Sequence, residues 1–179
     1  SINVGNQFTQ TLDGLSVMVD TLVMTNQVIT LNSGQIIANS ASIGEGSSLI
    51  LDGGGLDTQN LLIDGALLWT SGNISIGTQL QIGALGVLNI DGVGTLDLTD
   101  ASATNLGSLV KTNVGTLTVN AGTFTNQGNI TIQSGILDLG SNYVQQGGLL
   151  TLDSGTLQAG TLNLNGGILA GSGVITGNL

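Results

Sequence analysis

The stretch GVLNIDGVGTLDL at 86–98 is followed, one repeat later, by GSLVKTNVGTLTV at 107–119, and the two are identical at six of thirteen positions. Two further copies, GNITIQSGILDLG at 128–140 and GLLTLDSGTLQAG at 148–160, share six identities with each other, and GALLWTSGNISIG at 65–77 begins in the same register. Self-similarity at a short fixed period, here about 20–21 residues, indicates a protein built from stacked repeats. The clearest repeats lie in 65–179.

Within each copy, apolar and polar residues alternate, which is the period of a β-strand and not of a helix. The apolar centres recur three times in each repeat, so three short strands fit into it: Leu117, Phe124, Ile130, Leu137, Val144, Leu150 and Leu157. One repeat is then one three-sided coil, and equivalent strands can pair in parallel from coil to coil. The sequence therefore predicts an all-β parallel β-helix, or β-solenoid, of roughly nine coils.

The competing all-β architectures fit the chain less well. A β-sandwich or a propeller would need hairpin turns and aromatic motifs, and a repeat of about 20 residues is too short for a four-stranded blade. We expect a single domain over 1–179, in which 1–30 form an atypical first coil or a cap, because the repeat register loosens before residue 65. No polar cap follows the last repeat, so the chain is expected to be a fragment of a longer solenoid or a subunit that stacks end to end.

Stacking the copies predicts which residues point into the core. On one side of the coil the inward pairs are Leu96/Leu98, Leu117/Val119, Leu137/Leu139 and Leu157/Ala159, with Asp97, Thr118, Asp138 and Gln158 outward. On a second side they are Leu88/Ile90, Ile130/Ile132 and Leu150/Leu152, with Asn89, Val110, Thr131 and Thr151 outward. The third side is predicted to carry one dominant inward residue per coil, namely Phe124, Val144 and Leu164.

The composition excludes several classes of function. The chain has 30 Gly, no Pro, Cys or His, and a net charge of −10 from eleven acidic residues and Lys111. Binding to nucleic acid or to an anionic membrane surface needs many more cations than this. The absence of His and Cys removes the usual general base, zinc ligands, catalytic thiols and disulfides. The absence of Pro fits strands that are central in a sheet and need every N–H for pairing.

The chain also lacks targeting and membrane signals. No stretch approaches the roughly 18 consecutive apolar residues of a membrane span, and the first residues lack the basic region of a signal peptide. We therefore expect no membrane insertion and a mature or excised segment.

Two residues stand out at inward positions. Lys111 aligns with Ile90 and Ile132, and since a buried unpaired ammonium is costly, we expect the strand to end early or bulge so that the amine reaches solvent. Trp69 aligns with Ile90, and we expect it to fill the core and not to form a platform for sugar stacking.

The acidic residues offer the remaining candidates for chemistry. Asp91, Asp97 and Asp100 lie in one short run, and two carboxylates at suitable separation could cleave a glycosidic bond, although Asp in Gly-rich corners normally accepts backbone hydrogen bonds. The segments DGGGLD (52–57) and DGVGTLD (91–97) faintly resemble calcium loops but do not recur in tandem. Outward Thr and Asn columns are too irregular for an ice-binding face. We therefore assign no catalytic, cofactor-binding or metal-ligating residue.

Three phrases carry a resemblance to a known group of proteins: GTLTVNAGTFTNQGNITIQSG at 115–135, LLTLDSGTLQAGTLNLNGG at 149–167 and GGILAGSGVITGNL at 166–179. They resemble the repeats of filamentous haemagglutinin-like adhesins and of autotransporter passenger regions, which are large secreted bacterial surface proteins. The resemblance covers 65–179 well and 1–64 only loosely. It implies a right-handed parallel β-helix outside a bacterial cell and transfers no ligand site.

The function predicted from the sequence is therefore structural and non-enzymatic. We expect a stalk, spacer or filament building block of a secreted or cell-surface bacterial adhesin. Its partners would be neighbouring coils of a longer chain or other copies that stack end to end or laterally, with a host or matrix glycan as a further possible partner. A glycan- or ice-binding solenoid and a polysaccharide-processing β-helix enzyme stay open as alternatives.

Overall fold

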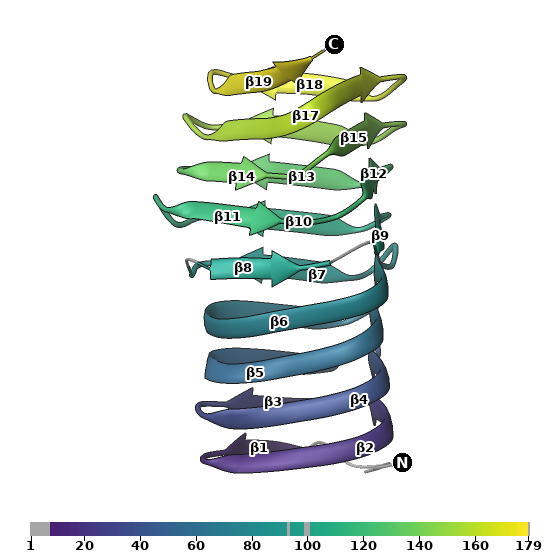
Figure 1. Ribbon diagram of the computed structural model, residues 1–179, viewed down its shortest axis with the longest axis vertical. Coiled ribbons are helices and arrows are strands. Elements are labelled where there is room, and N and C mark those ends of the chain that lie inside the picture. The colour runs from purple at the N-terminus through teal and green to yellow at the C-terminus, as the bar shows by residue number, and fades with distance from the viewer. Residues whose placement is uncertain (1–7, 93, 99–100, 179) are drawn as a thin grey trace.

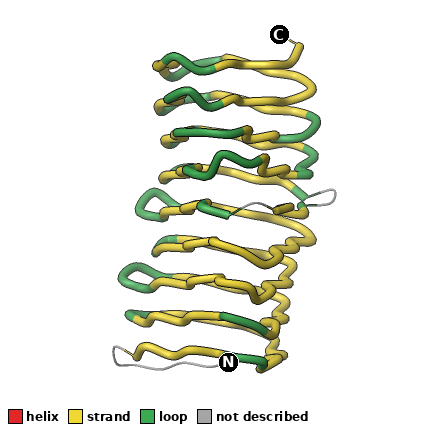
Figure 2. Tube along the Cα trace, turned by 90° about the vertical axis from the view of Figure 1, so that its left-hand side faces the viewer, coloured by secondary structure: helices red, strands yellow, loops and turns green. Residues whose placement is uncertain are grey.

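The computed structural model describes residues 8–92, 94–98 and 101–178, and the described residues form a parallel β-solenoid of about eight turns without a helix. In Figure 1 the chain rises from the N-terminus to the C-terminus, runs left to right along the near side and returns right to left along the far side, which is a right-handed coil. Figure 2 shows the same coils stacked one on another, with strands and loops alternating around each turn. The predicted β-helix is confirmed.

The strands divide each coil into three sides. The first four coils contain β1 (Phe8–Leu12) and β2 (Leu15–Met24), β3 (Gln27–Leu31) and β4 (Gly34–Ile43), β5 (Ser48–Ile63), and β6 (Ala66–Ile82). The next three coils contain β7 (Val87–Ile90), β8 (Gly94–Asp97) and β9 (Ser102–Asn105), then β10 (Ser108–Lys111), β11 (Thr116–Val119) and β12 (Thr123–Asn126), then β13 (Asn129–Ile132), β14 (Ile136–Asp138) and β15 (Asn142–Gln145). The last strands are β16 (Leu149–Leu152), β17 (Thr156–Leu164), β18 (Ile168–Gly171) and β19 (Val174–Asn178).

We name the three sides of the coil after β7, β8 and β9. The β7 side stacks β3, the first parts of β5 and β6, then β7, β10, β13, β16 and β18. The β8 side includes β8, β11, β14 and β19, and the β9 side includes β9, β12 and β15. The two longest strands, β5 and β6, pass continuously around all three sides.

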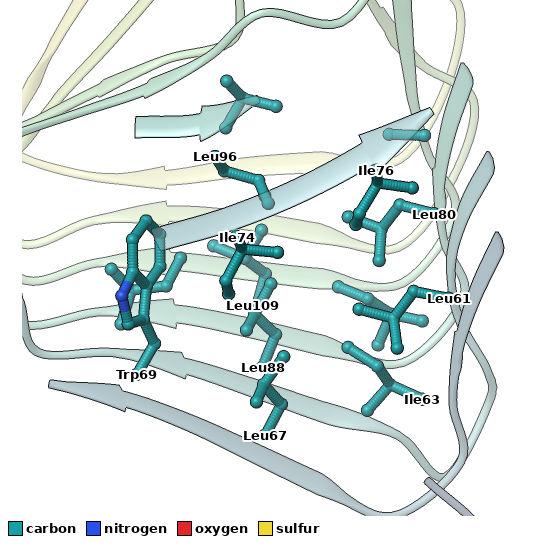
Figure 3. Packing of buried hydrophobic residues seen from close by; sticks show 14 of the residues in the cluster. Leu61, Ile63, Leu67, Trp69, Ile74, Ile76, Leu80, Leu88, Leu96 and Leu109 are labelled. Carbon is teal, nitrogen blue, oxygen red and sulfur yellow. The ribbon is translucent and has the colours of Figure 1, made fainter. Parts of the chain in front are cut away.

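The core is built from vertical columns of apolar side chains. Leu67, Leu88 and Leu109 follow one another up the β7 side, as Figure 3 shows, and all three are buried. Burying a side chain of this size contributes about 1.5–3 kcal/mol. The inward and outward positions predicted for this side are confirmed, and Trp69 is buried beneath Ile90 as core filler.

The predicted outward column of the β8 side is wrong at one step. Thr118 pairs with Thr95 and not with Asp97, which instead lies beside Ser75 of the coil below. The segment that joins the paired positions of β10 and β11 is longer by two residues than the one that joins β7 and β8, so the register shifts by two. A shift of two keeps every side chain on its face. The predicted inward residues of this side are therefore buried, and Thr118, Asp138 and Gln158 pair in sequence as expected.

Of the inward residues predicted for the β9 side after Phe124, Val144 is wrong. Phe124 pairs with Tyr143, and Tyr143 pairs with Leu162, whereas Val144 is half-buried and points outward. Leu164 pairs with the buried Gln145 and so has the predicted inward register, although its side chain is exposed at the upper end of the rod. Phe124 and Tyr143 are 19 residues apart, whereas Ile130 and Leu150, on the β7 side of the same two coils, are 20 apart, so the corner after β15 is longer by one residue. A single fixed period therefore predicts that the outward residues of β15 point into the core.

The early part of the chain continues the same stack with shorter coils. Ile29 pairs with Leu49, and Leu49 pairs with Leu67, so the second of these two coils is shorter than the first. β1 pairs in parallel with β3, and β2 with β4. The loosened register before residue 65 is a change in corner length and not an interruption of the coil.

Some corners admit only glycine. Gly72 has a φ of +96°, and a Cβ there would overlap the carbonyl oxygen of Gly54 in the coil below. Positive φ and close backbone approach both favour a residue without a Cβ.

Candidate functional site

The three acidic residues considered for glycan cleavage do not share one environment. Asp91 is exposed at the corner after β7, where it accepts a hydrogen bond of 2.6 Å from Thr112 Oγ1 of the next coil. Asp97 is half-buried at the end of β8, on the β8 side. Asp100 lies outside the described residues. The structure therefore places Asp91 in a contact between coils and does not bring it together with Asp97 on one strand.

The same carboxylate contact recurs along this corner. Thr70 Oγ1 donates to Asp52 Oδ1 at 2.8 Å, and Ser33 Oγ donates to Asp13 Oδ1 at 2.6 Å. In each case the hydroxyl belongs to the next coil, so an acid alternates with a hydroxyl from coil to coil. A charged acceptor makes the stronger class of hydrogen bond. These acids hold adjacent coils together through side-chain hydroxyls, whereas the sequence predicts that Asp in such corners accepts hydrogen bonds from backbone N–H groups.

The segments compared with calcium loops hold few carboxylates in one place. A shallow hollow of about 280 Å³ is lined by Gly53, Gly54 and Gly55 and contains one acidic residue, Asp57. Asp52, at the start of the segment, is the acceptor of the Thr70 contact. Over the ranges that the structure describes, no three His, Cys, Asp or Glu residues are grouped so that they could hold a metal ion. Calcium needs six to eight oxygen ligands, more than this hollow supplies as carboxylates.

Lys111 is buried, which corrects the expectation that its strand would end early. It keeps strict register with Ile90 and Ile132, and its side chain is 0 % exposed. The ammonium bends to the long corner after β10 and donates to the backbone oxygen of Asn113 at 2.5 Å. Burial lowers the pKa of Lys111 below its ordinary value of 10.5, and attraction to the Asp91 carboxylate opposes this shift.

A buried amide ladder runs inside the β9 side, and sequence reasoning missed it. Asn105 Nδ2 donates to Asn126 Oδ1 at 2.7 Å and to the backbone oxygen of Asn129 at 2.9 Å. Asn126 Nδ2 in turn donates to Gln145 Oε1 at 3.0 Å and to the backbone oxygen of Gly128 at 3.2 Å. Each of these two amides thus bonds both to the side chain of the next coil and to a backbone oxygen near a corner. Asn105 Oδ1, at the lower end, has no hydrogen-bond partner.

The two ends of the ladder differ in what they contact. At the lower end the same column continues through apolar side chains: Met24, Ile43, Ile63 and Ile82. At the upper end Tyr143 Oη donates to Gln145 Oε1, and Gln145 Nε2 donates to the backbone oxygen of Gly147. Burial raises the pKa of Tyr143 above its ordinary range, and a hydrogen bond with Asn126 opposes the shift.

One signal for the ladder was present in the sequence. Asn105, Asn126 and Gln145 each stand two positions after an inward side chain and shortly before a corner glycine. Alternation alone predicts that they point inward, but their polarity argues for the outside. The stacking of one amide above another resolves this conflict, because each amide forms a hydrogen bond with the amide of the next coil.

Comparison of the chain with protein-family models, with curated proteins and with solved structures finds no match. The resemblance to bacterial surface adhesins therefore rests on the repeat phrases alone, and the structure supports the β-solenoid architecture. Along the described ranges there is no helix with the length and hydrophobicity needed to cross a bilayer.

Proposed function

We propose that this chain is a non-enzymatic structural segment of a secreted or cell-surface bacterial protein, where it acts as a stalk, spacer or filament building block. The observation that carries the proposal is the uninterrupted parallel ladder, which links every coil from β1 to β19. About eight turns at about 4.8 Å per strand give a rod roughly 40 Å long. Two of the acids considered as candidates for chemistry, Asp52 and Asp91, are engaged in holding coils together.

The upper end of the rod supports extension by further coils. Leu169 is 53 % exposed, although its column neighbours Leu150 and Ile130 are buried, and Leu164 is 47 % exposed. These side chains have the inward register of the core and lack a coil above them. A following coil of the same chain, or the first coil of another copy, would cover them by the contacts that join all other coils.

Electron microscopy of the purified chain tests this extension. We expect particles whose length is a multiple of about 40 Å at high concentration. Leu169→Asp should shorten them to single rods, because it places a carboxylate on the apolar end. The control is Val114→Asp, which adds the same charge at a corner residue that is already 83 % exposed. Single rods for the unsubstituted chain at every concentration would refute end-to-end stacking.

The proposed location has its own test. Antibodies against the purified chain should label intact cells of the source organism as strongly as permeabilised cells. Labelling that requires permeabilisation would refute the surface location and leave the rod architecture unaffected.

A further inference from the structure

The outward surface of the β7 side differs from the rest of the rod in combining an apolar majority with the absence of any charged side chain. Its first column is Val28, Ser48, Ala66, Val87, Ser108, Asn129, Leu149 and Ile168, and its second is Thr30, Ile50, Leu68, Asn89, Val110, Thr131, Thr151 and Ala170. All sixteen are half-buried or exposed. Nine of them are apolar, and the rest are hydroxyls and amides.

The other two sides lack this combination. The outward columns of the β9 side are also uncharged, but only Val23, Leu62 and Val144 among their sixteen residues are apolar. The β8 side carries acids on its strands, including Asp57, Asp97 and Asp138. The other acids that the structure describes lie at corners or at the bend of β2, so the β7 side alone is both apolar and free of charge.

The size and composition of this surface fit a protein interface. Eight strands about 4.8 Å apart and four residues of about 3.3 Å give roughly 500 Å² on each copy, so two copies would bury about 1,000 Å² in total. That is the lower limit for a specific interface. The absence of charge from these sixteen residues matches the depletion of charged residues in the cores of interfaces.

The charge distribution selects the face through which two copies of this chain can meet. Two copies with a net charge of −10 each repel one another, and contact through the β8 side would bring carboxylates together. Contact through the β7 side buries apolar surface and leaves the acids at the rim or on the far side. We propose that the β7 side is an interface on which a second copy of this chain packs face to face.

The proposed pairing has two physical consequences. Paired sheets of this kind pack about 10 Å apart, so association doubles the width of the rod and leaves its length unchanged. Salt strengthens the pairing, because it screens repulsion between the two acidic molecules while the apolar contact stays intact. The inference rests on the proposed structural role, yet the end-to-end stacking described above changes length and not width, so either can fail alone.

The test compares two leucines in the same region of the rod. Leu68 points outward on the β7 side beside Ile50, and Leu62 points outward on the β9 side beside Ser42. Both are half-buried, and Leu68→Glu and Leu62→Glu change the net charge equally. Sedimentation equilibrium over about 1 µM to 1 mM measures the dimer dissociation constant of each variant and of the parent chain without either glutamate.

Every sample carries Leu169→Asp, which blocks end-to-end stacking, so that a doubling of mass reports lateral pairing. We expect this parent chain, of about 17.9 kDa, to approach twice that mass at the upper concentrations and at high salt. Leu68→Glu should raise the dissociation constant at least tenfold, whereas Leu62→Glu should change it less than twofold. If Leu68→Glu fails to fold, Leu68→Ser replaces it and should also weaken the dimer. Equal effects of the two glutamates would refute the assignment to the β7 side.

A chain that sediments at 17.9 kDa throughout would overturn the pairing. Retention of that monomer on an insoluble neutral polysaccharide, lost in Leu68→Glu and kept in Leu62→Glu, would assign the same surface to a glycan instead.

Discussion

Removing one member of the amide ladder tests whether the buried polar groups depend on each other. The substitution Asn126→Leu keeps the branched shape of the side chain, and Leu already occupies the same column at Leu164. It removes the acceptor of Asn105 Nδ2 and the donor to Gln145 Oε1. Asn105 then keeps only its bond to the backbone oxygen of Asn129, so one of its N–H groups is buried without a partner.

The magnitude follows from counting orphaned groups. A buried donor or acceptor that loses its partner costs about 1–3 kcal/mol. The single change Asn126→Leu orphans one N–H of Asn105, and the single change Asn105→Leu orphans Asn126 Oδ1. The double variant orphans neither of these groups, and it also removes Asn105 Oδ1, which has no partner in the native chain. The double variant should therefore be more stable than the sum of the single changes predicts by about 2–6 kcal/mol, one orphaning cost for each of the two groups.

Denaturant unfolding of the four proteins measures this coupling energy. The free energies are comparable when the slope against denaturant is the same for all four. A chain of this size loses about 2–4 °C in Tm per kcal/mol, so thermal unfolding gives an independent value. As a control, Thr125→Val changes a half-buried outward residue of the same strand and should couple with Asn105→Leu by less than about 0.5 kcal/mol. A coupling below that value for Asn105 and Asn126 would refute mutual satisfaction in the ladder.

Three further predictions concern single residues. Lys111→Met should stabilise the chain at neutral pH by about 1–4 kcal/mol, because it removes a buried ammonium. Since the folded chain binds this proton less tightly than the unfolded chain, the unfolding free energy of the parent should rise relative to Lys111→Met as pH increases toward 10.5, and parallel pH profiles would contradict this. Gly72→Ala should cost about 1–3 kcal/mol in denaturant unfolding, whereas Gly122→Ala, at an exposed corner without positive φ, should cost less than about 0.5 kcal/mol. Polysaccharides incubated with the chain should release no reducing ends, and cleavage that disappears in Asp97→Asn would refute the non-enzymatic proposal.

The architecture and most of the core were predictable because the strands carry a strong two-residue period. Leu88, Ile130 and Leu150 stand at equivalent positions of successive copies, and the structure stacks them with Leu109 on one side of the coil. The prediction survives errors in register, provided that the error is an even number of residues. Thr118 illustrates this, because it moved by two positions relative to β8 and stayed outward.

The β9 side was not predictable in the same way, for two physical reasons. Leu117 pairs with Leu137, 20 residues later, but Phe124 pairs with Tyr143, 19 residues later. The connection before β15 is thus one residue shorter than the connection before β12, and one residue exchanges the inward and outward sets. Tyr143 is also more polar than Val144, so the sequence favours Val144 for the core. In the structure the Tyr143 hydroxyl donates a hydrogen bond to Gln145 Oε1, which allows it to be buried. The prediction that the Lys111 amine reaches solvent was wrong for a related reason. Its ammonium donates to the backbone oxygen of Asn113, and the pattern of side chains does not reveal this contact.

Over the residues that the structure describes, the carboxylates lie on the β8 side, at the corners and at the bend of β2, which gives the rod an electrical polarity across its width. In a field, or beside a positively charged support, such a molecule turns about its long axis until the β8 side faces the positive charge. The β9 side, which is rich in hydroxyls and amides, and the apolar β7 side then both face away from the positive charge. A layer of these rods on a cationic surface would be oriented without any specific receptor, and its outer surface would carry charge only at the corners.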